Sequence, residues 1–241
     1  MSISLSILEY ESELSRLLER IEEARSFKRI LLLVKSGMLK SLHVDVMRPD
    51  LIRGETRFPL ILIKRLYENF IDMIPFQIHL MMKVPIDLID KLNMFIAEER
   101  RDKVSLVLQR EVFKSERKIL CNLNFIRNLG YKAGLGLDLP SSLKNLTKTL
   151  IANVDYVLLM TVPMGKGGQK YSPQATFKIA RFSKCFPEKE IEVDGGINEK
   201  TILEAKRAGA KTFVVGSYIT RNKNPLRALK KLRNVIGKNH I

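Results

Sequence analysis

Short apolar segments alternate with longer amphipathic segments along the whole of this 241-residue chain. Eight of the short segments have the composition of buried strands, and the stretches between them show helical spacing of their apolar residues. Strands that alternate with helices predict a parallel sheet, because a crossover helix returns the chain to the start of the next strand. The predicted strands cover residues 3–8, 41–47, 76–82, 104–108, 132–137, 156–162, 191–193 and 212–215.

The number of strands and the chain length together favour one architecture. A (β/α)8 barrel typically needs about 250 residues, and no Pro- or Gly-rich linker divides the sequence. We therefore expect one α/β domain over residues 1–241, a single parallel (β/α)8 TIM barrel, rather than a doubly wound sheet. The predicted helices cover residues 11–28, 59–69, 85–99, 111–129, a segment ending near 151, 173–185, 199–208 and 225–236, with a short one at 31–35.

The charge balance favours anionic ligands without defining one. The chain has 42 Lys and Arg against 26 Asp and Glu, a net charge of +16. Such a field attracts phosphorylated metabolites, nucleic acid or acidic membranes. A general bias toward Lys, Ile and Asn would produce the same charge, so charge alone does not separate these ligands.

Three further features indicate a cytoplasmic protein without a membrane partner. Cys121 and Cys185 lie far apart and form no CxxC motif, which is typical of a reduced, intracellular protein. The N-terminal segment lacks the basic region of a secretory signal. No apolar run approaches the roughly 18 residues of a membrane span.

Two histidines and two aspartates lie on, or directly after, three of the predicted strands. His43 and Asp45 share one face of their strand because strand side chains alternate with a period of two. His79 lies on the next strand, and Asp194 ends a later one just before two glycines. Such a set suits a divalent metal. The alternative is a His43–Asp45 hydrogen bond that only fastens the core.

Glycine clusters follow the last three predicted strands, where barrel enzymes often bind phosphate. Glycine lets backbone N–H groups approach an anion closely. Ordinary tight turns are the alternative interpretation. The clusters are Gly165-Lys166-Gly167-Gly168, Gly195-Gly196 and Gly216-Ser217.

The chain resembles the ribulose-phosphate 3-epimerase family over nearly its whole length. The stretches that carry the resemblance are SLSIL, HVDVM, IHLMM, MTVPMGKGGQKY, EVDGGIN and VVGS. The resemblance implies a (β/α)8 barrel that epimerises a ketose phosphate at C3, such as ribulose 5-phosphate to xylulose 5-phosphate, and that assembles as a homodimer or larger oligomer. It also implies one divalent metal per chain, zinc or iron(II) before manganese or cobalt, held by His43, Asp45, His79 and Asp194.

The same resemblance implies roles for individual residues. Asp45 and Asp194 would act as acid and base on the two faces of an enediolate. The sugar phosphate would contact the following positions: Ser6, Met47, His79, Met81, Met160, Gly165, Gly167, Gly168, Gln169, Gly195, Gly196, Gly216 and Ser217. Core filling is the other interpretation of the three methionines, because Met is a general gap-filler.

The chain departs from the family pattern around these residues. Arg48-Pro49 replaces the usual Asp-Gly, and Gln109 stands where the family usually has His, with Glu111 retained. Pro163-Met164-Gly165-Lys166 replaces Glu/Asn-Pro-Gly-Phe, and the first helical region is about ten residues longer than is usual. The four metal-ligand candidates are unchanged. Substrate preference is therefore less constrained than reaction type.

Other functions stay open beside pentulose-phosphate epimerisation. A hexulose-6-phosphate 3-epimerase, or a diverged phosphate-binding barrel with little activity, would show the same motifs. A barrel lyase or decarboxylase commonly needs a Lys at a strand end, and none is predicted near His43 or Asp194. A nucleic-acid binder would need clustered basic residues with stacking aromatics, whereas this chain has scattered Lys and Arg, no Trp and 7% aromatics.

Overall fold

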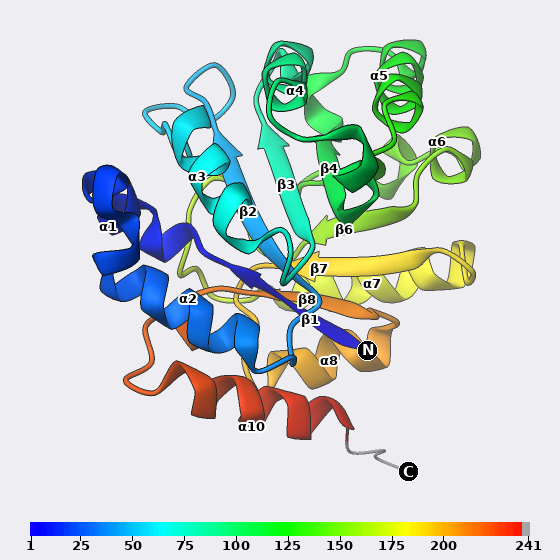
Figure 1. The fold of residues 1–241 in the computed structure, drawn as a ribbon. Coiled ribbons are helices and arrows are strands. Elements are labelled where there is room, and N and C mark those ends of the chain that lie inside the picture. The colour runs from blue at the N-terminus through cyan, green and yellow to red at the C-terminus, as the bar shows by residue number, and fades with distance from the viewer. Residues whose placement is uncertain (238–241) are drawn as a thin grey trace.

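Eight parallel strands close into a barrel in the computed structural model, which describes residues 1–237. The strands pair in chain order, and β1 pairs with β8 to close the ring, as the blue and orange strands show in Figure 1. This confirms the predicted (β/α)8 fold. The strands are β1 (Ser2–Ser6), β2 (Ser41–Met47), β3 (Phe76–Met81), β4 (Val104–Gln109), β5 (Lys132–Leu137), β6 (Tyr156–Met160), β7 (Glu190–Asp194) and β8 (Thr212–Val215).

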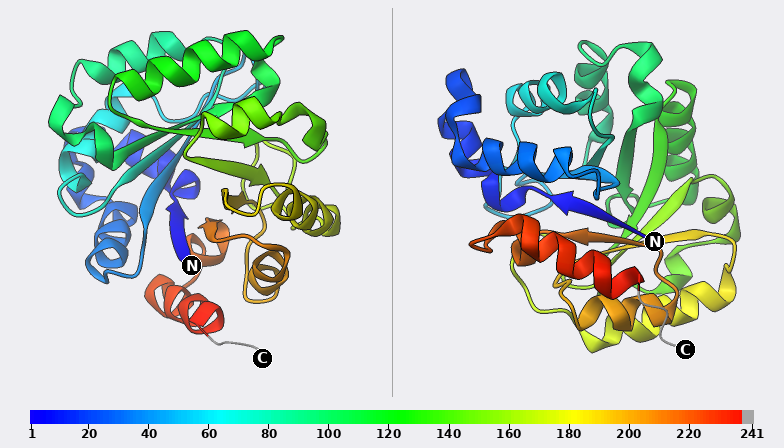
Figure 2. Two further views of the ribbon diagram at one scale, coloured as in Figure 1. Left: turned by 90° about the vertical axis from the view of Figure 1, so that its right-hand side faces the viewer. Right: turned by 60° about the horizontal axis from the view of Figure 1, so that its bottom comes forward.

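Helices surround the barrel on its outside (Figure 2). The last helix, α10, contacts α2 and α8, so an early and a late helix of the chain flank it on one side of the barrel. Within residues 1–237, no helix has the length and apolar character needed to cross a bilayer. The helices are α1 (Glu11–Arg16), α2 (Arg25–Lys35), α3 (Leu60–Phe70), α4 (Pro85–Asn93), α5 (Glu116–Asn128), α6 (Lys148–Ala152), α7 (Pro173–Cys185), α8 (Thr201–Ala208), α9 (Ser217–Thr220) and α10 (Pro225–Gly237).

The two faces of each strand differ in chemistry. Outward side chains such as Val44 on β2 and Ile78 on β3 belong to the large apolar core between the barrel and its helices. Inward positions carry many polar groups, which are nonetheless buried: Ser4, Ser6, Ser41, His43, Asp45, Gln77, His79, Gln109, Glu192 and Thr212. Because buried polar groups need partners, these side chains form a hydrogen-bonded network. The rest of the barrel interior is filled by a smaller apolar cluster of Val107, Tyr156, Leu158, Met160, Val162 and Val214.

The predicted single helix over residues 11–28 is wrong. The chain forms α1, then a 3-10 segment at Leu18–Glu23, then α2, which also takes in the predicted short helix at 31–35. Arg20 and Ala24 leave the helical region of backbone conformation, and Ala24 is fully buried. Both bends turn the apolar residues Leu14, Ile21 and Ile30 toward the same core.

Other element ends also differ from the predicted ones. The first strand stops at Ser6 and the fourth helix at Asn93. The predicted helix over 111–129 begins only at Glu116, where the Ser115 hydroxyl accepts a hydrogen bond from the Lys118 N–H. Glu111 lies instead in a 3-10 turn directly after β4, which places its carboxylate beside the barrel mouth.

Candidate metal and substrate site

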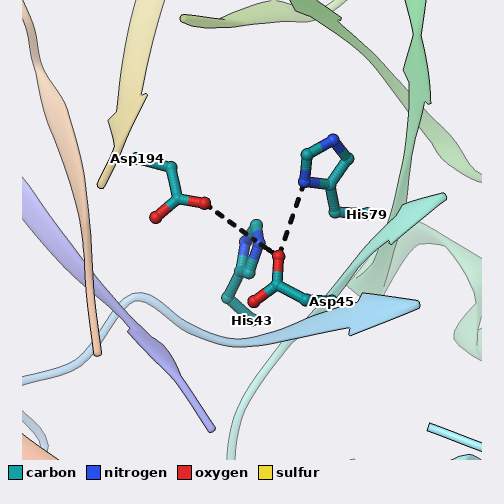
Figure 3. A group of neighbouring side chains, drawn as sticks. All are labelled: His43, Asp45, His79 and Asp194. Atoms are coloured by element: carbon teal, nitrogen blue, oxygen red, sulfur yellow. Dashed lines mark hydrogen bonds and ion pairs between the residues drawn. The ribbon is translucent and has the colours of Figure 1, made fainter. Parts of the chain in front are cut away.

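His43, Asp45, His79 and Asp194 meet inside the barrel. Asp45 and His79 stand opposite each other in the register of β2 and β3, and Asp194 ends β7. One ligand atom from each residue can be chosen so that all four lie within 4.8 Å of one another. Figure 3 shows the four side chains pointing toward a common centre. The cluster could therefore hold a metal ion.

His43 is fixed from below by a chain of buried polar groups. Its Nδ1 lies 2.7 Å from Gln77 Oε1, while its Nε2 lies 3.0 Å from Asp45 Oδ1. The Gln77 amide donates to Glu192 Oε2 at 2.5 Å and to the Tyr156 hydroxyl at 2.6 Å. Because an amide oxygen only accepts, Nδ1 carries a proton and Nε2 faces the cluster. Such outer partners orient metal-binding histidines.

His79 leaves one nitrogen without a partner. Its Nε2 lies 2.8 Å from Gln109 Oε1. Its Nδ1 is buried, makes no hydrogen bond and lies 3.5 Å from Asp45 Oδ1. A nitrogen lone pair that faces a carboxylate at this distance is unfavourable unless a proton or a cation lies between them. The residues present therefore fit a metal ion bound among them.

The two carboxylates have opposite shifts in acidity. Burial alone would raise the pKa of Asp45, but the charge and hydrogen bond of His43 hold it well below its usual range. Burial and the charge of Asp45 raise the pKa of Asp194 to about 7, against an opposing effect of His43. Burial tends to lower the pKa of His43, yet Asp45 and Asp194 raise it to about 10. A divalent cation would keep both carboxylates ionised.

A cavity opens above this cluster at the C-terminal ends of the strands. It contains every residue predicted to contact substrate except His79, which lies beneath the lining with His43. The cavity also contains residues that the sequence did not single out, namely Leu8, Glu9, Val162, Ile197 and Val214. The predicted residues that line it are Ser6, Asp45, Met47, Met81, Met160, Gly165, Lys166, Gly167, Gly168, Gln169, Asp194, Gly195, Gly196, Gly216 and Ser217.

The glycine loops are packed backbone to backbone beside the cavity. A Cβ atom on Gly196 would lie 2.2 Å from the Tyr171 backbone nitrogen, and the φ angle of Gly196 is +64°. The Thr161 N–H donates to the Asp194 carbonyl at 2.7 Å, so the end of β7 and the loop after β6 are joined. Only glycine satisfies both the contact and the backbone angle at this position.

The buried His43–Asp45 bond exists, but it is not the whole of the cluster. A bond that only fastened a core would leave no reason for a second histidine with an unpaired nitrogen, or for Asp194 at a cavity floor. Among residues 1–237, Lys is also absent from the buried polar set. Lys166, which is exposed, lines the rim of the cavity.

Fold and site together define a class of protein, a (β/α)8 barrel enzyme with a His/Asp cluster beneath a glycine-rimmed cavity. Residues 20–220 match the model of the ribulose-phosphate 3-epimerase family. The chain belongs to this family, whose members are isomerases.

The relatives that support this assignment match most of the chain. The ribulose-phosphate 3-epimerase of Helicobacter pylori strain 26695 is 32% identical over 203 residues, which cover 80% of this chain and 85% of that protein. The enzyme of Schizosaccharomyces pombe is 29% identical over 198 residues and 82% of each chain.

Solved structures of more distant proteins share the fold. The 3-hexulose-6-phosphate synthase of Salmonella typhimurium is 16% identical, covers 98% of both chains and has a TM-score of 0.67. The 3-keto-L-gulonate-6-phosphate decarboxylase of Vibrio cholerae is 11% identical with a TM-score of 0.67, over 98% of this chain and 96% of that one.

Proposed function

We propose that the chain epimerises ribulose 5-phosphate to xylulose 5-phosphate at C3. The observation that carries this proposal is the meeting of Asp45 and Asp194, from strands three places apart around the barrel, at the floor of one cavity with His43 and His79. Epimerisation beside a ketone needs a proton removed from one face of a carbon and another returned to the opposite face. Two carboxylates on either side of a flat enediolate can do both.

One divalent metal ion would be held by Asp45, Asp194, His43 Nε2 and His79 Nδ1. Mixed imidazole and carboxylate ligands suit zinc or iron(II), and also manganese or cobalt. When bound, the ion would act as a Lewis acid that polarises the ketone oxygen and favours the enediolate.

The rest of the cavity is suited to hold the sugar phosphate in place. Met47, Met81 and Met160 are almost fully buried and line the cavity, so they would exclude water from the intermediate. Backbone groups near Gly168, Gly196 and Ser217 would bind the phosphate, as phosphate is often bound in (β/α)8 barrels. Lys166, on the same rim, would add a positive charge.

The decisive experiment measures exchange of the C3 proton with solvent deuterium. Ribulose 5-phosphate and a hexulose 6-phosphate are incubated separately with protein reconstituted with zinc, iron(II), manganese or cobalt. We expect exchange and epimer formation with the pentulose phosphate, and about one bound metal ion per chain. Chelation should remove the metal ion and abolish the activity. Protein that retains no metal under any loading condition would overturn the proposal.

A hexulose-6-phosphate 3-epimerase is the second candidate. The observation that favours it is the altered rim, where Lys166 and the loop after Arg48 replace the usual family residues. Faster exchange with the hexulose phosphate would select it. We also propose a cytoplasmic homodimer or larger assembly, as for the resembling family, and sedimentation of the purified protein tests the assembly.

A further inference from the structure

We infer that Gln109 is a positioning residue, which fixes the orientation and the protonated nitrogen of His79 so that Nδ1 is free to bind a cation. The inference rests on the proposed metal site. It assigns the role to a residue outside the four ligands and outside the cavity lining.

The direction of the Gln109 amide is set by its second neighbour. Its Nε2 donates to Glu111 Oε2 at 2.6 Å, and a carboxylate can only accept. The amide oxygen must then face His79, 2.8 Å from Nε2. Since that oxygen can only accept, Nε2 of His79 must carry a proton, which leaves Nδ1, on the side of Asp45, as the nitrogen that can bind a cation.

Glu111 is itself held by the backbone of the next strand. Its Oε1 accepts from the Asp138 N–H at 3.0 Å, directly after β5. Both oxygens of the Glu111 carboxylate therefore have partners. If the Gln109 amide were rotated by 180°, its oxygen would face Glu111 Oε2, and neither atom could donate a hydrogen bond. The Glu111 carboxylate at the barrel rim thus sets the orientation of the Gln109 amide, and the amide in turn sets which nitrogen of His79 carries a proton.

β5 leaves room for this arrangement. A Cβ atom on Gly136 would lie 2.5 Å from Gln109 Oε1 and 3.3 Å from His79 Nε2. The backbone angles of Gly136 do not themselves demand glycine, because its φ is not positive. Glycine is required at this position because the Gln109 amide and the His79 imidazole occupy the space that a side chain would need.

The test uses four variants of the full chain. Q109M keeps the length of the side chain but replaces the amide oxygen by a thioether sulfur, which is only a weak acceptor for Nε2. G136A leaves Gln109 in the sequence but crowds its oxygen. The double variant Q109E/E111Q reverses donor and acceptor at the rim while still offering an acceptor to His79. T212V is the control, since it removes hydrogen bonds of an equally buried interior side chain at the opposite end of the barrel.

Two readouts are measured. The chain has only three histidines, so long-range ¹⁵N–¹H correlation spectra of metal-free protein can report which nitrogen of His79 is protonated. Zinc affinity is measured by competition with a chromophoric chelator. Loss of an outer partner of a metal ligand typically costs about 10–100-fold in affinity.

We expect wild type and Q109E/E111Q to show an Nε2-protonated His79 and zinc affinities within a few-fold of each other. Q109M and G136A should show mixed protonation and the 10–100-fold loss, while T212V should match wild type. Wild-type spectra and affinity in both Q109M and G136A would overturn the inference, as would an equal loss in T212V. If Q109M fails to fold, G136A and the double variant decide.

The result also separates this inference from the proposed function. A wild type that binds no zinc would refute the metal site, while the protonation of His79 in the metal-free variants would still decide the role of Gln109.

Discussion

Asp45 and Asp194 lie in one cluster but their charges have opposite effects on folding. The ionised Asp45 is stabilised by His43, whereas the pKa of Asp194, raised to about 7, means that its charge is disfavoured. Between about pH 4 and 7 the folded metal-free chain retains a proton on Asp194 that the unfolded chain releases, so this group lowers stability as pH rises. The pKa of Asp45 is lowered in the folded chain, so its ionised form stabilises the fold. This stabilisation is lost as pH falls and Asp45 becomes protonated.

Asparagine at each position should therefore change the stability of metal-free protein in opposite directions. At pH 8 we expect D45N to lose about 3–5 kcal/mol of unfolding free energy, as when one partner of a buried pair is removed. D194N should gain about 1–3 kcal/mol, since one pKa unit corresponds to about 1.4 kcal/mol, and at pH 4 it should match wild type. Urea unfolding in chelator measures both. A lower unfolding free energy in both variants at pH 8 would contradict the opposite pKa shifts of Asp45 and Asp194.

The same two variants should agree in their effect on catalysis. On the proposed function, each variant loses a proposed acid–base group and a proposed metal ligand. Loss of general acid–base catalysis typically costs about 10²–10⁴-fold in rate. We expect both metal-loaded variants to fold, to bind metal weakly and to lose at least this much activity in the C3 exchange assay. Wild-type rates in both would mean that the proton-transfer groups lie elsewhere, with Glu111 and Lys166 next to be tested.

Period-two alternation predicted that His43 and Asp45 share one face of their strand, and the resemblance to the epimerase family implied that these two residues meet His79 and Asp194 at one metal. The sequence did not predict the buried side chains that hydrogen-bond to the cluster residues. Gln77 and Glu192 are one inward position below His79 and Asp194, so the same alternation could have indicated that they face the interior. Which of their atoms pair depends on three-dimensional distances that no spacing in the sequence contains.

At the scale of elements, the segment from Arg48 to Phe58 shows how a departure from the family pattern is accommodated. Arg48 Nη1 donates to the carbonyls of Met47 at 2.8 Å and Arg57 at 2.7 Å, and Nη2 donates to that of Phe58 at 3.3 Å. Ile52 from this loop would lie 2.8 Å from a Cβ on Gly165. The arginine thus fastens a loop that packs against the glycine loop at the cavity.

Removing this contact should weaken substrate binding more than chemistry. R48M loses hydrogen bonds of a charged donor, each worth about 1.5–3 kcal/mol when well formed. We expect a higher KM for the sugar phosphate, with kcat and metal content within a few-fold of wild type. R53M, an exposed arginine of the same loop, is the control. A fall in metal content in R48M, or an equal KM change in R53M, would show that Arg48 does not act through the loop.

Element boundaries were less predictable than element types. The eight strands and most helices follow from periodicity, but the break between α1 and α2 does not, because residues 11–35 carry a nearly continuous helical pattern. The bends at Arg20 and Ala24 arise from packing of Ile21 and its neighbours against the barrel. Tertiary contacts override local preference there.

For the whole molecule, the net charge of +16 should speed the capture of a phosphorylated substrate. Salt screens such fields, since the Debye length falls from about 30 Å at 10 mM to about 10 Å at 100 mM. We therefore expect kcat/KM for ribulose 5-phosphate to fall several-fold as sodium chloride is raised over this range. No comparable fall in kcat is expected, because capture does not limit turnover at saturation.

A pair of matched variants separates the general field from a local charge at the cavity. Lys166 is exposed on the cavity rim, and Lys230 is exposed on α10; replacing either by Met removes one positive charge from the molecule. A single charge near a phosphate is worth about 1 kcal/mol in water, so K166M should lower kcat/KM about fivefold at 10 mM salt and reduce its salt dependence. K230M should stay close to wild type. Equal effects of the two variants would mean that only net charge matters, and a larger effect of K230M would place substrate capture at α10 rather than at the glycine loops.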